Sequence, residues 1–149
     1  MDSKTSDFND LWAYSDTDWA GDIETSRSTT RYAIFLGNGI VFWLSRRQWR
    51  VTLSFTEAEY CGMTKTTKQL CWIHNLYEEL GFKLGSLPLC IDNQGAIFLT
   101  SNPAHEGHTK HVWMTEHFIR ESVEFGEIKL YYIPTNQQFA DIFTKNLGK

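Results

Sequence analysis

The sequence contains few cysteines, few prolines and no long hydrophobic run, and each scarcity excludes a class of protein. Its three cysteines, Cys61, Cys71 and Cys90, cannot all pair within the chain and form no C-x-x-C motif, which predicts reduced thiols. Three prolines in 149 residues exclude collagen-like and low-complexity chains. The longest apolar stretch, Tyr32 to Leu44, is interrupted by Gly37-Asn38-Gly39 and is shorter than the ~20 residues of a membrane helix. We therefore expect a soluble globular protein without a membrane partner.

Positive charge is also scarce. Lysine and arginine number 14 against 18 aspartates and glutamates, which gives a net charge of -4. Domains that bind nucleic acid usually have an isoelectric point above ~9. Either the partner is not nucleic acid, or local basic groups and bound cations supply what the total charge lacks. The first thirty residues show no secretory signal, so we expect a cytoplasmic or nuclear protein that is not secreted.

The first half of the chain is typical of antiparallel strands. Leu11–Tyr14 is a short apolar run that predicts a buried strand ending before Asp16. Tyr32–Leu36 and Ile40–Leu44 flank Gly37-Asn38-Gly39, and these turn residues tolerate the positive φ angles of a tight hairpin. Three antiparallel strands are therefore predicted at the start of the chain.

Helices and strands alternate in the second half. Ser54 and Glu57 form a capping box that predicts a helix from Ser54 whose apolar stripe ends at Leu80. Leu87–Ile91 predicts a short strand that ends at Asp92. The remaining predicted elements are a helix from Asn93 to Asn102, a helix over Thr109–Phe125, a strand over Ile128–Ile133 and a helix over Gln137–Lys145. This order favours a mixed sheet with helices on both faces, in one domain over residues 11–147 after a flexible lead-in of residues 1–10.

Four carboxylates from distant parts of the chain are candidates for a shared site. They are Asp16, Glu59, Asp92 and Asp141. Isolated acids are normally solvated, but Asp16 and Asp92 end apolar runs, where a charge is costly unless it is paired or bound to a cation. Clustered oxygen ligands select Mg²⁺ or Mn²⁺, and a pair of such ions ~3.5 to 4 Å apart can cleave phosphodiesters.

Several motifs around these acids occur in an order that resembles one family. The motifs are Tyr14-Ser15-Asp16-Thr17-Asp18-Trp19-Ala20-Gly21-Asp22, Ser54-Phe55-Thr56-Glu57-Ala58-Glu59-Tyr60, Asp92-Asn93-Gln94, Thr109-Lys110-His111, His117-Phe118-Ile119-Arg120-Glu121 and Ala140-Asp141-Ile142-Phe143-Thr144-Lys145. Together they resemble the ribonuclease H domain of copia-type retrotransposon polyproteins, from about Leu11 to Leu147. The resemblance implies the ribonuclease H fold, with a five-stranded mixed sheet. It also implies hydrolysis of the RNA strand of RNA:DNA hybrids.

The resemblance implies roles for the four acids. The catalytic tetrad falls on Asp16, Glu59, Asp92 and Asp141, which would hold two Mg²⁺ ions, with Mn²⁺ as a substitute. By resemblance, Asp16 bridges both ions, Glu59 and Asp92 complete the shell of one, and Asp141 holds the ion that activates water. A reverse transcriptase domain of the same polyprotein is the implied protein partner.

Seven further positions are candidates for contacts to the hybrid. Gln94 matches a residue that touches the minor groove, and Ser54 and Thr56 fall near a phosphate-contacting segment. The remaining four are basic candidates for phosphate contacts: Arg46, Arg47, Lys110 and Lys145. Arg46 and Arg47 belong to the densest basic cluster, for which a solvated strand end is an equally good interpretation.

Some residues depart from the family pattern. Phe55 replaces a small polar residue, Thr30-Arg31 replaces Ser-Gly, and His108 replaces Arg. These changes predict weak affinity for nucleic acid, and a domesticated or inactive interaction module is the alternative to an enzyme.

The remaining histidines and tryptophans have plainer interpretations. His105, His108 and His111 form H-x-x-H-x-x-H, which we interpret as loop or phosphate-facing residues because no cysteine or fourth ligand for zinc lies nearby. Of the tryptophans, we expect Trp43 and Trp72 in the core and Trp19 facing the substrate.

Overall fold

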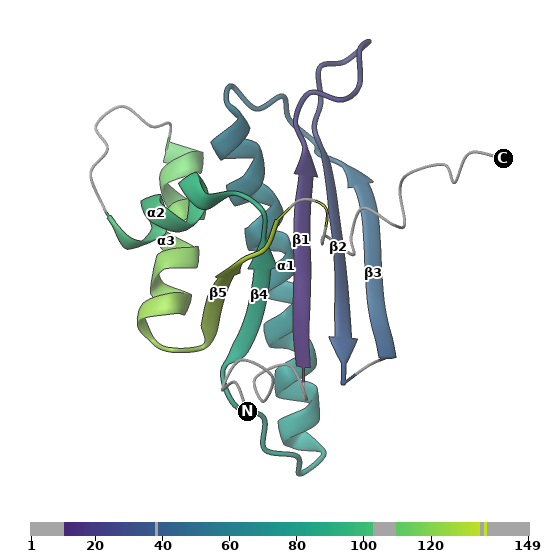
Figure 1. Ribbon diagram of the computed structural model, residues 1–149, viewed down its shortest axis with the longest axis vertical. Coiled ribbons are helices and arrows are strands. Elements are labelled where there is room, and N and C mark those ends of the chain that lie inside the picture. The colour runs from purple at the N-terminus through teal and green to yellow at the C-terminus, as the bar shows by residue number, and fades with distance from the viewer. Residues whose placement is uncertain (1–10, 38, 103–109, 135, 137–149) are drawn as a thin grey trace, which may run out of the picture.

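The computed structural model describes residues 11–37, 39–102, 110–134 and 136. Within these ranges the chain forms five strands and three helices (Figure 1). The elements are β1 (Leu11–Asp18), β2 (Thr29–Leu36), β3 (Gly39–Arg47), α1 (Phe55–Glu79), β4 (Leu87–Ile91), α2 (Gln94–Ser101), α3 (Lys110–Glu124) and β5 (Ile128–Tyr132). No helix among the described residues is both long enough and apolar enough to cross a membrane.

The strands form one mixed sheet in the order β3-β2-β1-β4-β5. The first three strands pair antiparallel, as the hairpin signals predict. β4 then pairs parallel to β1, and β5 pairs parallel to β4. The predicted five-stranded mixed sheet is confirmed. Because β1 and β4 are parallel neighbours, their carboxyl ends lie at the same end of the sheet.

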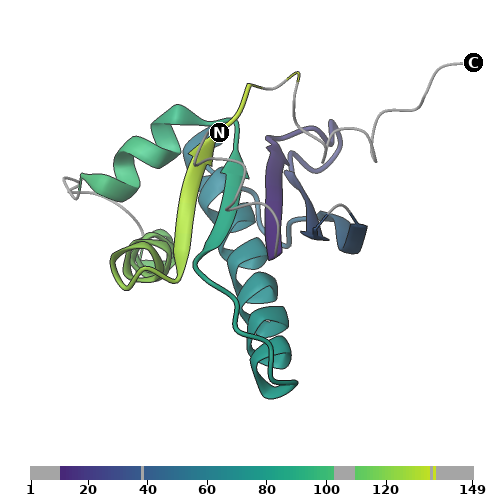
Figure 2. The same cartoon turned by 60° about the horizontal axis from the view of Figure 1, so that its bottom comes forward.

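The main core lies between the sheet and the helices. α1 runs along β1 and contacts β2 and β4, and α2 and α3 both contact α1 and β5 (Figures 1 and 2). The described helices therefore all cover the same face of the sheet. The buried residues of this core include Leu11, Ala13, Ile34, Tyr60, Met63, Leu70, Leu89, Ile91, Ile119 and Ile128.

A second, aromatic cluster occupies the opposite face of the sheet. Trp12 stacks on Phe35 with ring centroids 4.2 Å apart and meets Tyr14 edge-on, beside buried Cys90. The predicted helix over residues 137–145 lies outside the described residues, so coverage of both faces stays a prediction.

The start of α1 confirms the capping box. The Ser54 hydroxyl accepts a hydrogen bond from the Glu57 amide at 3.1 Å, which satisfies one of the free amides of the first turn. The Glu57 carboxylate accepts from the Leu53 amide at 2.7 Å, one residue before the position expected of a capping box. Both contacts fix the position at which α1 begins.

The structure corrects three predictions about strand and helix ends. β1 continues to Asp18, so Asp16 lies within the strand and does not follow it. β2 already begins at Thr29. Leu80 is 64% exposed, because α1 ends at Glu79 and Leu80 lies beyond the last residue that packs on the core.

The sequence prediction that two tryptophans lie in the core is wrong. Trp43 and Trp72 are each 60% exposed. Trp43 lies on the edge strand β3, which is mostly exposed along its length, and Trp72 lies on the solvent side of α1. The three cysteines are free, and Cys90 is buried.

Candidate active site

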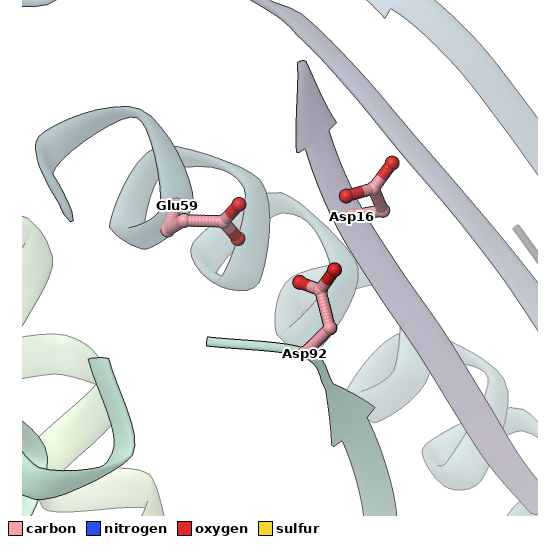
Figure 3. A group of neighbouring side chains, drawn as sticks. All are labelled: Asp16, Glu59 and Asp92. Carbon is pink, nitrogen blue, oxygen red and sulfur yellow. The ribbon is translucent and has the colours of Figure 1, made fainter. Parts of the chain in front are cut away.

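Three of the four predicted acids converge where β1, β4 and α1 meet. One carboxylate oxygen from each of Asp16, Glu59 and Asp92 lies within 4.8 Å of the others. The three side chains point toward one another from separate elements (Figure 3). Asp141, the fourth predicted acid, lies outside the described residues.

Strand pairing explains why Asp16 and Asp92 meet. The parallel register of β1 and β4 aligns Ala13 with Leu89 and Tyr14 with Cys90. The same register, continued along both strands, aligns Asp16 with Asp92. Because parallel strands advance together, two acids at matched positions are adjacent even though they are far apart in sequence.

Close packing of α1 on β1 brings in Glu59. A Cβ atom at Gly62 would lie 2.5 Å from the Thr17 hydroxyl oxygen, so only glycine allows this approach. The Thr66 hydroxyl donates to the Ser15 hydroxyl at 3.0 Å one turn further along. Glu59 precedes Gly62 by almost one helical turn and therefore faces β1 as well.

Glu59 is the most unusual acid of the cluster. It is fully buried, and neither of its carboxylate oxygens accepts a hydrogen bond from the described residues. Burial raises the pKa of Glu59 to about 9, with further contributions from the charges of Asp16 and Asp92, which the nearby Thr17 amide offsets only in part. A buried carboxylate beside two other acids is stabilised when a cation binds. The donor set therefore fits a divalent metal ion.

An arginine also faces this cluster. Arg31 on β2 is directly opposite Asp16 in the antiparallel register. Its guanidinium nitrogens lie 3.7 Å from an Asp16 oxygen and 3.6 Å from an Asp18 oxygen. In the sequence, Arg31 stands out only as a departure from the family pattern. Its contact with Asp16 follows from strand register, which the sequence pattern does not specify.

Retrovirus-related Pol polyproteins are similar in sequence to nearly the whole chain. It is 41% identical over 140 residues to the retrovirus-related Pol polyprotein from transposon RE2 of Arabidopsis thaliana, and 38% identical over 135 residues to that from transposon TNT 1-94 of Nicotiana tabacum. These matches cover 93% and 91% of the chain. The chain spans about a tenth of the length of these relatives. No protein-family model matches the chain.

Comparison with solved structures identifies the fold. The LC11 ribonuclease H1 isolated from compost superposes with a TM-score of 0.67 at 14% identity, over 90% of this chain and 91% of that one. The same enzyme in complex with an RNA/DNA hybrid gives a TM-score of 0.65 at 12% identity, over 89% and 91% of the two chains. The chain has the ribonuclease H fold. Together with the Pol polyprotein relatives, this confirms the predicted resemblance.

Three predicted hybrid contacts lie near the acids of this ribonuclease H fold. Gln94 is exposed at the first residue of α2, two residues after Asp92. Ser54 is exposed as the N-cap of α1, and Thr56 is half-buried in its first turn. These three residues thus lie at the start of α1, which carries Glu59, and at the start of α2, which follows Asp92. Trp19 is 45% exposed, and its indole nitrogen donates to the Thr52 carbonyl at 3.4 Å, so its contact with a substrate stays a prediction.

The predicted basic contacts are distributed over two elements. Arg46 and Arg47 are exposed at the end of β3, where Arg47 pairs with Asp22 at 2.9 Å. Lys110 begins α3 and, with Arg50, lines a cavity of about 970 Å³ between α3 and the loop that precedes α1. Lys145 lies outside the described residues, as do His105 and His108.

Proposed function

We propose that this domain hydrolyses the RNA strand of RNA:DNA hybrids with the help of two divalent metal ions. The observation that carries this proposal is Glu59, a buried carboxylate without a hydrogen-bond partner among the described residues, held against Asp16 and Asp92. A purely structural role would require hydrogen-bond partners for such a group, since a buried carboxyl without them destabilises a fold whether it is charged or neutral. A cation site would explain why a carboxylate is buried beside two other acids.

The proposed ligands are Asp16, Glu59, Asp92 and, by resemblance, Asp141. Their oxygen donors match Mg²⁺ and Mn²⁺, which prefer carboxylates. When bound, a pair of such ions supplies an activated water and stabilises the leaving oxygen of a phosphodiester. The protein's own contribution is rigid placement, because strand register fixes Asp16 and Asp92, and the contact at Gly62 fixes Glu59.

The proposed substrate follows from the exposed groups around the acids. Hybrids are recognised through 2′-hydroxyls in a wide, shallow minor groove, which suits polar contacts from Gln94, Ser54 and Thr56. Arg50 and Lys110 line a cavity that opens beside the same end of α1, where phosphates of the second strand could bind. The solved neighbour bound to an RNA/DNA hybrid supports this substrate. The Pol polyprotein relatives support a reverse transcriptase domain as partner.

A cleavage assay tests the proposal. Hybrids labelled on the RNA or on the DNA strand, and duplex DNA, are incubated with the protein in Mg²⁺, in Mn²⁺ and in EDTA. We expect cutting of the RNA strand in both metals, no cutting in EDTA and no cutting of duplex DNA. Equal cleavage of duplex DNA and hybrid would instead indicate a general nuclease on the same fold.

The position of Arg31 favours one alternative function, in which the domain binds nucleic acid without cutting it. A guanidinium beside Asp16 and Asp18 places a permanent positive charge where a metal ligand is expected. A domesticated copy that keeps the fold and binds nucleic acid without cutting it would tolerate such a residue. Binding of hybrid without cleavage in Mn²⁺ would support this interaction module.

A further inference from the structure

A second groove lies between α1 and strands β2 and β3, and it shares Gln48, Trp49 and Lys65 with the cavity that Lys110 lines. It has a volume of about 760 Å³, and Tyr32 and Leu44 of the sheet line it opposite Lys65 and Trp72 of α1. We call it the α1–β3 groove. Its full lining is Arg27, Tyr32, Leu44, Arg46, Arg47, Gln48, Trp49, Lys65, Lys68, Gln69 and Trp72. Five of these residues are cations and none is an acid.

Part of this positive charge is not balanced within the protein. Arg47 pairs with Asp22, and the Lys68 ammonium lies 5.4 Å from the Phe118 ring centroid. Arg46 and Lys65 have no carboxylate within 4.0 Å among the described residues. Burial lowers the pKa of Lys65, nearby Cys61 opposes this effect, and the charge of Arg46 adds to it. Two neighbouring cations without an acid, in a chain of net charge -4, indicate that an external anion completes the groove.

Two tryptophans line the same groove and are exposed. Trp49 lies in the loop after β3 and is 82% exposed, and Trp72 on α1 is 60% exposed. Trp72 follows Lys65 by seven residues, or about 10 Å along the helix. Along α1, a cation and an exposed indole thus line the same groove.

We propose that the α1–β3 groove binds single-stranded nucleic acid, through phosphate contacts to its cations and stacking of bases on Trp49 and Trp72. A cationic groove with exposed aromatic rings is how proteins bind single strands without reading sequence. An acidic peptide would use the cations but would leave both indoles without a role. The combination therefore favours a nucleic-acid strand.

The groove lies near the acid cluster. Its role in the cell, as we propose it, rests on the proposed function of that cluster. Arg46 and Arg47 pair with Thr30 and Thr29 in the sheet, and these pair with Thr17 and Asp18 of β1. The groove therefore opens at the same end of the sheet as the acids, two strands away, which is about 10 Å. A single-stranded extension of a bound hybrid could enter it there.

Binding of a single strand can be measured without cleavage. A fluorescent single-stranded DNA of roughly 12 nucleotides is titrated with the full chain in EDTA, and anisotropy is recorded at several salt concentrations. Trp72→Ala should weaken binding by at least about fivefold, the lower end for loss of one base stack. Lys65→Gln should weaken binding and also reduce the salt dependence, by about 0.7 in the log–log slope per lost phosphate contact.

Two matched variants serve as controls. Trp113→Ala removes a tryptophan of α3 with 56% exposure, and Lys83→Gln removes an exposed lysine outside the groove. Both should bind like the wild type. Thermal unfolding of each variant confirms that it is folded, and Trp72→Phe should restore most of the binding if stacking is the cause.

The outcomes separate the groove from the proposed function. Wild-type affinity in both Trp72→Ala and Lys65→Gln would contradict the proposal that the groove binds single-stranded nucleic acid. Equal displacement of the DNA by polyglutamate of the same charge would also contradict it, because the groove would then bind an acidic protein segment. A wild type that binds the single strand but cuts no hybrid would refute the proposed function alone. Cleavage of blunt hybrid by Trp72→Ala should stay at the wild-type rate.

Discussion

The acid cluster and the α1–β3 groove use charge in opposite ways. In the cluster, Asp16, Asp92 and the fully buried Glu59 are held within 4.8 Å of one another. In the groove, cations that include exposed Arg46 and half-buried Lys65 line the space, and no acid does. The net charge of -4 averages these two regions and describes neither. A chain can therefore be acidic overall and still present a cationic surface to nucleic acid.

The two regions should also respond to different conditions. Most charges in the groove are exposed, so salt screens them within a Debye length of about 8 Å at physiological ionic strength. Glu59 is buried and lies close to half-buried Asp16 and Asp92, so the repulsion among these acids is screened less and depends on protons and metal ions. Salt tests the groove, whereas pH and divalent metal test the cluster.

The largest effect is expected from removal of one acid. Asp92→Asn should reduce hybrid cleavage by roughly 10³-fold or more, because a preorganised ligand of the reacting centre is lost. The metal-free fold should be equally or more stable, since one source of repulsion on Glu59 is removed. Initial cleavage rates and urea unfolding measure the two effects.

Glu79→Gln provides a control for this variant, because it neutralises an exposed acid at the far end of α1. Its cleavage rate should equal that of the wild type. If Asp92→Asn also cleaved at the wild-type rate, the role assigned to Asp92 would belong to a neighbouring acid such as Asp18 or Asp22.

The second effect concerns stability and pH. The pKa of Glu59 is raised from 4.5 to about 9, so the folded metal-free protein binds more protons than the unfolded chain between these values. Its stability should therefore fall as the pH rises from about 5 to 9. Glu59→Gln should remove most of this slope and stabilise the metal-free fold by up to roughly 3 kcal/mol at pH 7. Urea unfolding across this pH range without metal measures both, and an unchanged slope would contradict the assignment.

The smallest effect is expected at Arg31. Its guanidinium lies 3.7 Å from Asp16 and competes electrostatically with a bound cation. Arg31→Ser should raise the affinity for Mn²⁺ at least about fivefold, which corresponds to ~1 kcal/mol for a charge pair at this distance in water. Arg31→Lys keeps the charge and should leave the affinity near that of the wild type. Calorimetric titration measures the affinities, and a lower affinity in Arg31→Ser would show that Arg31 supports the site.

Local signals predicted much of the fold. Leu87–Ile91 forms β4 with the predicted ends, because a short apolar run between turn residues has few other structures available. The Ser54 cap fixed the start of α1, and β2 and β3 pair antiparallel as the predicted hairpin requires. Three of the four acids in the predicted site also meet in the structure.

Tertiary context explains what the sequence did not predict. Trp43 and Trp72 were expected in the core from their size, but an edge strand and the outer side of α1 leave them exposed. The contact of Arg31 with Asp16 depends on pairing register, and a one-residue slip would have moved it to the other face. The groove itself arises from segments far apart in the sequence, so no single motif marks it.

The most direct test of the account asks whether Asp16, Glu59 and Asp92 together bind a divalent cation. The free energy of unfolding is measured at pH 8 as Mn²⁺ is added to the wild type and to Asp92→Asn. Binding to the folded state alone should stabilise the wild type, by about 2.7 kcal/mol when Mn²⁺ reaches a hundred times its Kd. Asp92→Asn should gain far less at the same concentrations. No stabilisation of the wild type, or equal stabilisation of both proteins, would contradict the account.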